Sequence, residues 1–143
     1  NQILNKFQGN PPKLDLKEEK KNGKFIKKIM VTTNFIVGCH DLSEGGIALG
    51  LAELCIKNSK GIKIRIPKNI PNKKQWLFGE DQSRYLIAVN DENTFVKMAK
   101  IAKIFFQKLG IVDGESLDFV NEFEISVKEL IKYNKKWFNN YTS

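Results

Sequence analysis

Apolar side chains recur every three or four residues along four stretches of the chain, a spacing typical of amphipathic helices. These stretches cover residues 15–30, 43–58, 91–109 and 126–143. We therefore expect four helices, each with one face in the core. In the second stretch the buried stripe is predicted to be Ile47, Leu51, Leu54 and Cys55, and its small residues Ala48, Gly50 and Ala52 allow close approach to a neighbour.

Polar residues and glycines mark the ends of these predicted helices. The first and last helices open on an acid or hydroxyl residue followed three positions later by glutamate, the pattern of a capping box. The third helix is expected to continue to a stop at Gly110. Its apolar stripe comprises Phe95, Met98, Ala99, Ala102, Phe105, Phe106 and Leu109.

Short apolar or alternating runs between the helices indicate strands. Several of these runs follow one another without a helix between them. That order favours an α+β fold, with a mixed or antiparallel sheet and helices packed on one face, over a doubly wound parallel sheet. The expected strands are 35–39, 62–66, 84–89, 111–112 and a pair within 117–125, with turns at Asp113–Gly114 and Asn121–Glu122.

The length of 143 residues predicts a single domain. Residues 1–12 end at Pro11–Pro12, which a helix cannot cross, and are expected to be a lead-in from a preceding domain. Residues 13–143 are expected to form the domain itself, with 126–143 as its closing helix. The chain lacks an initiator methionine, which indicates a piece of a longer protein.

The formal charge of +8 admits an acidic partner, such as nucleic acid or a phosphorylated ligand. Of the 24 basic residues only Arg65 and Arg84 are arginine, and the lysines are spread over every predicted element. We therefore do not expect nucleic acid as a partner, although a small module binding RNA or another polyanion remains the alternative function. No apolar run is long enough to span a membrane, so no membrane partner is expected.

The chain has two cysteines, Cys39 and Cys55, and one histidine, His40. The cysteines form neither a C-x-x-C pair nor a metal-binding pattern with the histidine. Both are expected to be small buried hydrophobes in a reducing compartment, which predicts a cytoplasmic protein. No metal ligands are predicted.

The first candidate site lies where the strand 35–39 turns into the second helix. The turn contains His40, Asp41, Ser43 and the glycine pair Gly45–Gly46. Free backbone N–H groups at a helix start, together with the helix dipole, favour an anion such as phosphate. The hydroxyl of Ser43 is expected to cap the helix, and the glycines allow close approach of a ligand. A capped turn without a ligand is the other reading.

The second candidate site is the run Gly79-Glu80-Asp81-Gln82, directly before the strand 84–89. Acid and amide side chains of this kind hold magnesium, pair with cations, or hydrogen-bond a sugar or amide. A solvated turn is again the other reading.

Together, the two candidate sites closely resemble phosphoribosylformylglycinamidine synthase, in the last domain of its synthetase component. The quoted stretches are His40 to Ala48 and Leu77 to Leu86, and Gly9 to Leu16 is similar to the family's approach to this domain. The end, from Ile125 to Leu130, is similar to its closing strand and helix. That domain belongs to the superfamily of aminoimidazole ribonucleotide synthetase, selenophosphate synthetase and thiamine-monophosphate kinase.

This resemblance implies an ATP-dependent ligase of purine synthesis that turns formylglycinamide ribonucleotide into the amidine with ammonia from glutamine. ATP and magnesium are expected to bind mainly outside these residues. The implied partners are a preceding nucleotide-binding domain and a glutaminase subunit or domain. No catalytic residue is expected in this chain, and alone it is expected to be inactive. Another enzyme of the same superfamily is a third possibility.

The resemblance also implies roles for single residues. Gly45 and Gly46 would offer N–H groups to a phosphate, while Glu80, Asp81 and Gln82 would orient a ribose or amide or hold partner loops. Ser43 is a further candidate for binding the substrate or its phosphate. His40 and Asp41 are candidates for proton transfer or for a structural hydrogen bond. The sequence departs from the family's commonest form at two positions, with Glu44 in place of Asp and Ser83 in place of Gly.

Overall fold

The computed structural model describes the backbone of residues 15–142 and the side chains of residues 15–136. The predicted lead-in 1–12 and the first two residues of the predicted domain lie outside the described residues. The elements are α1 (Leu16–Thr32), β1 (Ile36–Asp41), α2 (Gly46–Asn58), β2 (Ile62–Ile64), α3 (Lys73–Phe78), β3 (Tyr85–Val89), α4 (Glu92–Ile101), β4 (Gly110–Val112), β5 (Ser116–Phe119), β6 (Phe123–Ser126) and α5 (Val127–Thr142).

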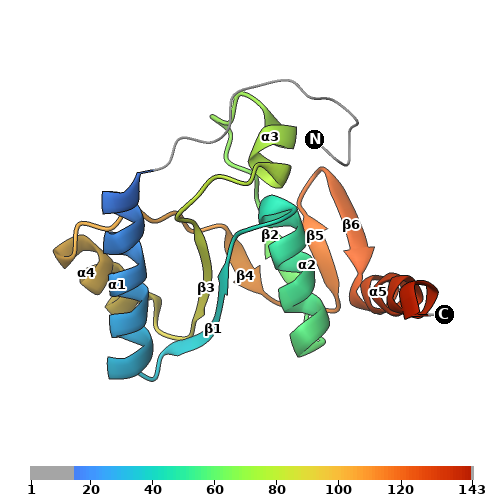
Figure 1. The fold of residues 1–143 in the computed structure, drawn as a ribbon, viewed down its shortest axis with the longest axis horizontal. Coiled ribbons are helices and arrows are strands. Elements are labelled where there is room, and N and C mark those ends of the chain that lie inside the picture. The colour runs from blue at the N-terminus through green and yellow to red at the C-terminus, as the bar shows by residue number, and fades with distance from the viewer. Residues whose placement is uncertain (1–14, 143) are drawn as a thin grey trace.

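The strands form two sheets (Figure 1). β1 and β3 pair antiparallel as a two-stranded ribbon. The larger sheet has the order β4-β2-β5-β6, in which β2 and β5 are parallel and the other neighbours antiparallel. The predicted α+β class with mixed and antiparallel pairing is therefore confirmed, with the strands divided between two sheets.

The buried apolar residues form two clusters. α1 and α4 cover the β1–β3 ribbon through a cluster centred on Phe25, Ile29 and Ala99 (Figure 1). α2 lies against the larger sheet, where Cys55 and Phe119 are almost fully buried. The described helices lack the combination of length and apolar character that a membrane crossing requires. The predicted stripe on α2 is confirmed, since Ile47, Leu51 and Cys55 are buried and Leu54 packs against them.

Both predicted capping boxes supply the cap that they indicate. The Asp15 carboxylate accepts from the backbone N–H of Glu18 at 3.1 Å, and the Ser126 hydroxyl accepts from that of Glu129 at 3.2 Å. These bonds satisfy N–H groups that have no partner within the helix. The predicted turns are also present, with Asn121 and Gly114 at positive φ.

The prediction of a continuous helix to Gly110 is wrong. α4 ends at Ile101, and Lys103 adopts a left-handed φ of 53°. The N–H of Ile104 donates to the Ala99 carbonyl at 2.9 Å and the N–H of Lys103 to the Lys100 carbonyl at 3.0 Å, which is a Schellman motif. The left-handed residue after a helix is usually glycine. Because this position is Lys103, the sequence gives no signal that the helix ends here. Gly110 instead begins β4.

Substituting Lys103 with glycine is expected to raise the free energy of unfolding by about 0.5–1 kcal/mol, because glycine adopts the left-handed conformation without steric cost. The same substitution at Lys97, inside α4, is expected to lower it by about 1 kcal/mol. Urea unfolding of the two variants and the parent chain measures both changes. Equal destabilisation by both substitutions would contradict the assignment of Lys103 as the left-handed cap.

α3 is a further difference, because the sequence patterns predict neither a helix nor a strand between residues 66 and 84. The Asn72 side chain accepts from the N–H of Gln75 at 3.1 Å and caps the helix. The helix is only six residues long, so no periodicity develops that sequence inspection can detect. Its buried residue Leu77 packs into the core around α2. α3 thereby delivers the second polar cluster to the start of α2.

Candidate functional site

The two candidate clusters meet at the N-terminus of α2. The backbone N–H of Gly45 donates to Oε1 of Glu80 at 3.1 Å, across 35 residues of sequence. Gly45 is the N-cap of α2, so a carboxylate lies at the positive end of the helix dipole. Glu80 thus occupies a position at which an external anion would also be favoured.

The glycine pair is required by the backbone itself. Gly45 and Gly46 have φ values of 75° and 63°, both in the left-handed region. A Cβ on Gly46 would lie 2.7 Å from the carbonyl oxygen of Gly79 and 2.8 Å from that of Leu77. The end of α3 therefore contacts the Gly46 backbone directly. This contact alone accounts for glycine at position 46.

Ser43 does not cap α2 through its hydroxyl, contrary to the sequence prediction. The helix begins at Gly46, and no side chain caps it. Instead the Ser43 carbonyl accepts from the N–H of Gly46 at 3.2 Å. The reason is geometric: two consecutive left-handed glycines tighten the turn, so the backbone of Ser43 reaches the helix start.

Arg84 fastens the loop between α3 and β3. Its guanidinium donates to the carbonyl of Gly79 and lies 3.4 Å from Oδ2 of Asp81. Its own carbonyl accepts from the N–H of Leu42 at 2.9 Å, which joins the loop to the end of β1. Sequence reasoning did not single out Arg84. The sequence does contain one signal for Arg84: it lies three residues after Asp81, a spacing at which opposite charges can pair.

Ser83 provides a second tie in this loop. It has a left-handed φ of 67°, which explains why glycine suits this position. The side-chain amide of Asn22 in α1 donates to the Ser83 hydroxyl at 3.0 Å and to its carbonyl at 3.2 Å. The hydroxyl thus adds a contact that glycine cannot make. No sequence signal identifies Asn22, because 61 residues separate the two partners.

The remaining polar residues of the two clusters face solvent. Ser43, Glu44, Asp81 and Gln82 are exposed at the edge formed by α2, α3 and the loop before β3. A rigid backbone thus carries accessible hydroxyl, carboxylate and amide groups. Such groups suit the recognition of a polar ligand or a neighbouring domain.

His40 turns away from this edge. Its Nε2 lies 3.1 Å from Oε2 of Glu53 on α2, so it joins β1 to the side of that helix. Gly50 makes this approach possible, because a Cβ there would lie 3.0 Å from the His40 ring. Asp41, at the end of β1, is exposed. The two residues therefore diverge, and His40 makes its structural contact with α2 rather than across the turn.

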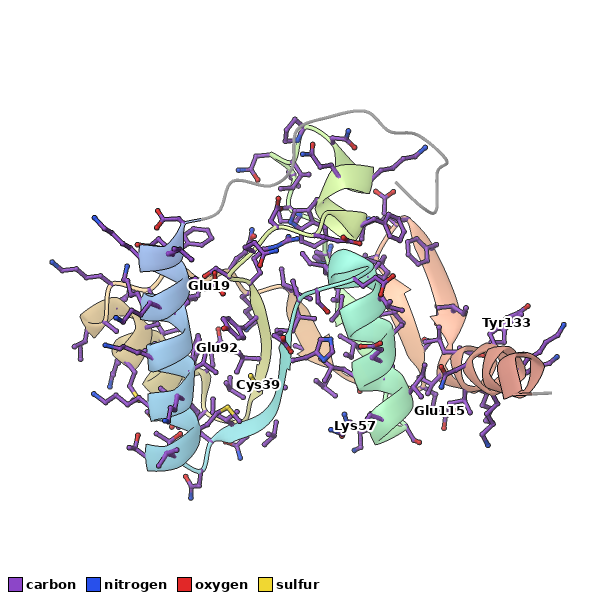
Figure 2. The ribbon with its side chains drawn as sticks, in the orientation of Figure 1. Glu19, Cys39, Lys57, Glu92, Glu115 and Tyr133 are labelled. Atoms are coloured by element: carbon purple, nitrogen blue, oxygen red, sulfur yellow. The ribbon has the colours of Figure 1, made fainter. Side chains whose placement is uncertain are left out.

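Neither cysteine is activated as a nucleophile. Burial raises the pKa of the Cys55 thiol to about 11. Burial, assisted by the negative charge of Asp41, also raises the pKa of Cys39, which points from β1 toward α1 (Figure 2). Both thiols are therefore protonated at neutral pH. Cys39 is only partly buried, whereas the sequence predicts full burial.

Substituting Glu80 with alanine is expected to lower the free energy of unfolding by about 1 kcal/mol, since it removes the acceptor of the Gly45 N–H at the helix start. The control is Gln82→Ala, which removes an exposed side chain two residues away and is expected to change stability by less than about 0.5 kcal/mol. Guanidinium unfolding followed by circular dichroism compares the variants. Equal stabilities would show that the Gly45–Glu80 bond adds nothing to the fold.

Comparison with known proteins identifies the family. The model for "AIR synthase related protein, C-terminal domain" matches residues 2–120. The phosphoribosylformylglycinamidine synthase subunit PurL of Bartonella bacilliformis is 41% identical over 138 residues, covering 95% of this chain and 18% of that protein. The corresponding subunit of Pelagibacter ubique is 36% identical over 141 residues, covering 97% of this chain and 19% of that protein. The chain thus spans less than a fifth of these relatives.

Solved structures share the fold. Phosphoribosylformylglycinamidine synthase II of Thermotoga maritima superposes with a TM-score of 0.66 at 21% identity, over 84% of this chain and 22% of that one. T. maritima PurL complexed with FGAR gives a TM-score of 0.62 at 21% identity, over 79% of this chain and 21% of that one. Since the family model matches most of the chain, the protein belongs to the family of AIR synthase related proteins, as their C-terminal domain.

Proposed function

We propose that this chain is the C-terminal part of an enzyme that converts formylglycinamide ribonucleotide, ATP and glutamine-derived ammonia into formylglycinamidine ribonucleotide, in purine biosynthesis. The family match and the named relatives support this assignment. The observation that carries a role for this domain is the joining of its two polar clusters by the Gly45–Glu80 hydrogen bond. Two motifs that meet on one edge present their groups to one ligand or one neighbouring domain.

The proposed reaction has two steps. ATP phosphorylates the amide oxygen of the substrate. Ammonia then adds to the amide carbon, and phosphate leaves. Both steps depend on positioning and on stabilisation of charge. The contribution proposed for this chain is the rigid edge at the start of α2, from which Ser43, Asp81 and Gln82 contact a ribose, an amide or a neighbouring loop.

The proposed phosphate site at the glycine pair involves Glu80. The N–H groups of Gly45 and Gly46 are engaged by the Glu80 carboxylate and the Ser43 carbonyl. Within residues 15–142, no group accepts from the N–H of Ile47 or Ala48, in the first turn of the helix. A phosphate at this helix start therefore binds Ile47 and Ala48 first and competes with Glu80 for Gly45.

The other components are assigned to parts of the enzyme outside this chain. The described residues contain no group of three or more His, Cys, Asp or Glu side chains arranged to hold a metal ion. The proposal therefore places magnesium and the reacting ATP mainly on a preceding nucleotide-binding domain. A glutaminase subunit or domain supplies the ammonia, and the enzyme works in the cytoplasm. In this scheme residues 13–143 are the domain and 1–12 its lead-in.

A chimera tests the assignment. The matched segment of the Bartonella bacilliformis subunit, to which this chain is 41% identical, is replaced by the present chain. The chimera is expected to form the amidine from ATP, ammonium and substrate within about tenfold of the parent rate, because matching domains position the same groups. The isolated chain, assayed in parallel, is expected to show no turnover.

Two outcomes contradict the proposal. A chimera that unfolds as cooperatively as its parent and yet lacks activity would show that the chain does not replace the segment it resembles. Turnover by the isolated chain would show that the chemistry does not require the missing parts. Thermal unfolding of the chimera distinguishes loss of function from loss of fold.

A further inference from the structure

Lysines are spread over every predicted element, and five of the six lysines in α1 border a single groove. The groove runs between α1 and the end of α4, has a volume of about 510 Å³, and is bordered by five lysines of α1. Figure 2 shows side chains that end in nitrogen spreading from the outer side of this helix. The five are Lys17, Lys20, Lys21, Lys24 and Lys28.

These lysines repel one another. Each of the five has another three or four residues away, so that their ammonium groups are neighbours on the helix surface. Of these five lysines, only Lys21 has a carboxylate partner among the described residues, namely Glu18 at 3.3 Å. Each like-charged pair at this spacing destabilises a helix by about 0.2–0.5 kcal/mol. An anionic ligand along the groove would relieve that repulsion.

The floor of the groove is apolar. It is formed by Phe25 of α1 together with Ala102 and Ile104, which follow α4. The Phe25 ring is 6% exposed and stands edge-on to Phe95, with centroids 6.2 Å apart. The Phe25 ring therefore offers a nucleic acid base no free face to stack on. Leucine or isoleucine side chains, in contrast, fit an apolar floor.

We propose that this groove binds an acidic segment of a partner protein, one that carries apolar side chains between its carboxylates. Charge complementarity selects acidic residues for the lysine border, and the floor selects apolar ones. The lysine stripe from Lys17 to Lys28 is about 16 Å long, which matches about three turns of a helical segment. This inference does not depend on the proposed enzyme function.

A binding experiment tests the proposal with the full 143-residue chain. The probe is a fluorescein-labelled amphipathic peptide of about four helical turns with glutamate on one face and leucine on the other. Two control peptides replace glutamate by glutamine or leucine by serine, and a single-stranded oligouridylate tests nucleic acid.

The groove variant combines Lys20→Glu with Lys24→Glu. The matched variant combines Lys128→Glu with Lys132→Glu, two exposed lysines at the same spacing on α5.

The acidic apolar peptide is expected to bind with micromolar affinity, and each control peptide about tenfold more weakly or worse. The groove variant is expected to weaken binding at least about tenfold, and the α5 variant by less than about twofold. Binding that both variants reduce equally would overturn the proposal, because net charge alone would explain it. Preferential, groove-dependent binding of oligouridylate would also overturn it in favour of a nucleic acid site. Circular dichroism verifies that each variant is folded.

Discussion

Substitution of Gly46 with alanine is expected to lower the free energy of unfolding by about 3 kcal/mol. Two effects add. The left-handed φ of 63° costs a residue with a Cβ about 1–2 kcal/mol. In addition, the new methyl group would lie within 3 Å of the Leu77 and Gly79 carbonyl oxygens. Because these are backbone atoms, the end of α3 has to move away from α2.

Gly114 provides the matched control. It has a similar φ of 73°, but a Cβ there has no neighbour within 4 Å. Gly114→Ala is therefore expected to lower stability by about 1 kcal/mol, the conformational part alone. Urea unfolding of both variants separates the two contributions. If both variants lose the same free energy, the close approach of α3 to Gly46 is refuted.

Leu77→Ala is expected to lower the free energy of unfolding by about 3 kcal/mol, as large-to-small substitutions in cores do. Leu77 is 7% exposed and anchors α3 in the core around α2. Its neighbour Phe78 is 50% exposed, so Phe78→Ala is expected to cost less than about 1 kcal/mol although it removes a larger side chain. Calorimetric unfolding of the two single variants tests this contrast, and a greater loss for Phe78→Ala would refute the anchoring role.

The two predictions concern the same contact from opposite sides. Gly46 lets α3 approach α2, and Leu77 holds it there. In the proposed enzyme, either substitution would displace Glu80, Asp81 and Gln82 from the start of α2. Loss of stability and loss of ligand recognition at this edge are therefore expected together.

Sequence patterns predicted the elements that local rules determine. The caps at Asp15 and Ser126 are short-range hydrogen bonds, and the stripe of α2 follows from helical periodicity. The glycine pair was singled out as a turn into a helix, and it is one. In each case the residues that decide the structure lie within a few positions of one another.

The differences arise where partners are distant or a residue is unusual for its role. Lysine at position 103 ends α4 where glycine is the common choice, so the apolar stripe was extended too far. Ser43 does not cap α2 as predicted, because the glycines of the turn determine where α2 starts. His40 pairs with Glu53, thirteen residues away on another element, rather than with a group in its own turn.

At the candidate site, the sequence indicated which clusters carry polar chemistry, but not how they fit together. The contact between Glu80 and Gly45 depends on the position of α3. This helix is too short to be recognised from its periodicity. Arg84 and Asn22 hold the same loop through contacts that only the folded chain brings about.

The most direct test of the coupling between the two clusters is the hydrogen exchange rate of the Gly45 amide, measured by NMR. The hydrogen bond to Glu80 predicts that this amide exchanges at least about tenfold more slowly than that of Gly114, and that Glu80→Ala removes most of the difference. Equal rates in the parent chain, unchanged by Glu80→Ala, would show that the clusters are not joined.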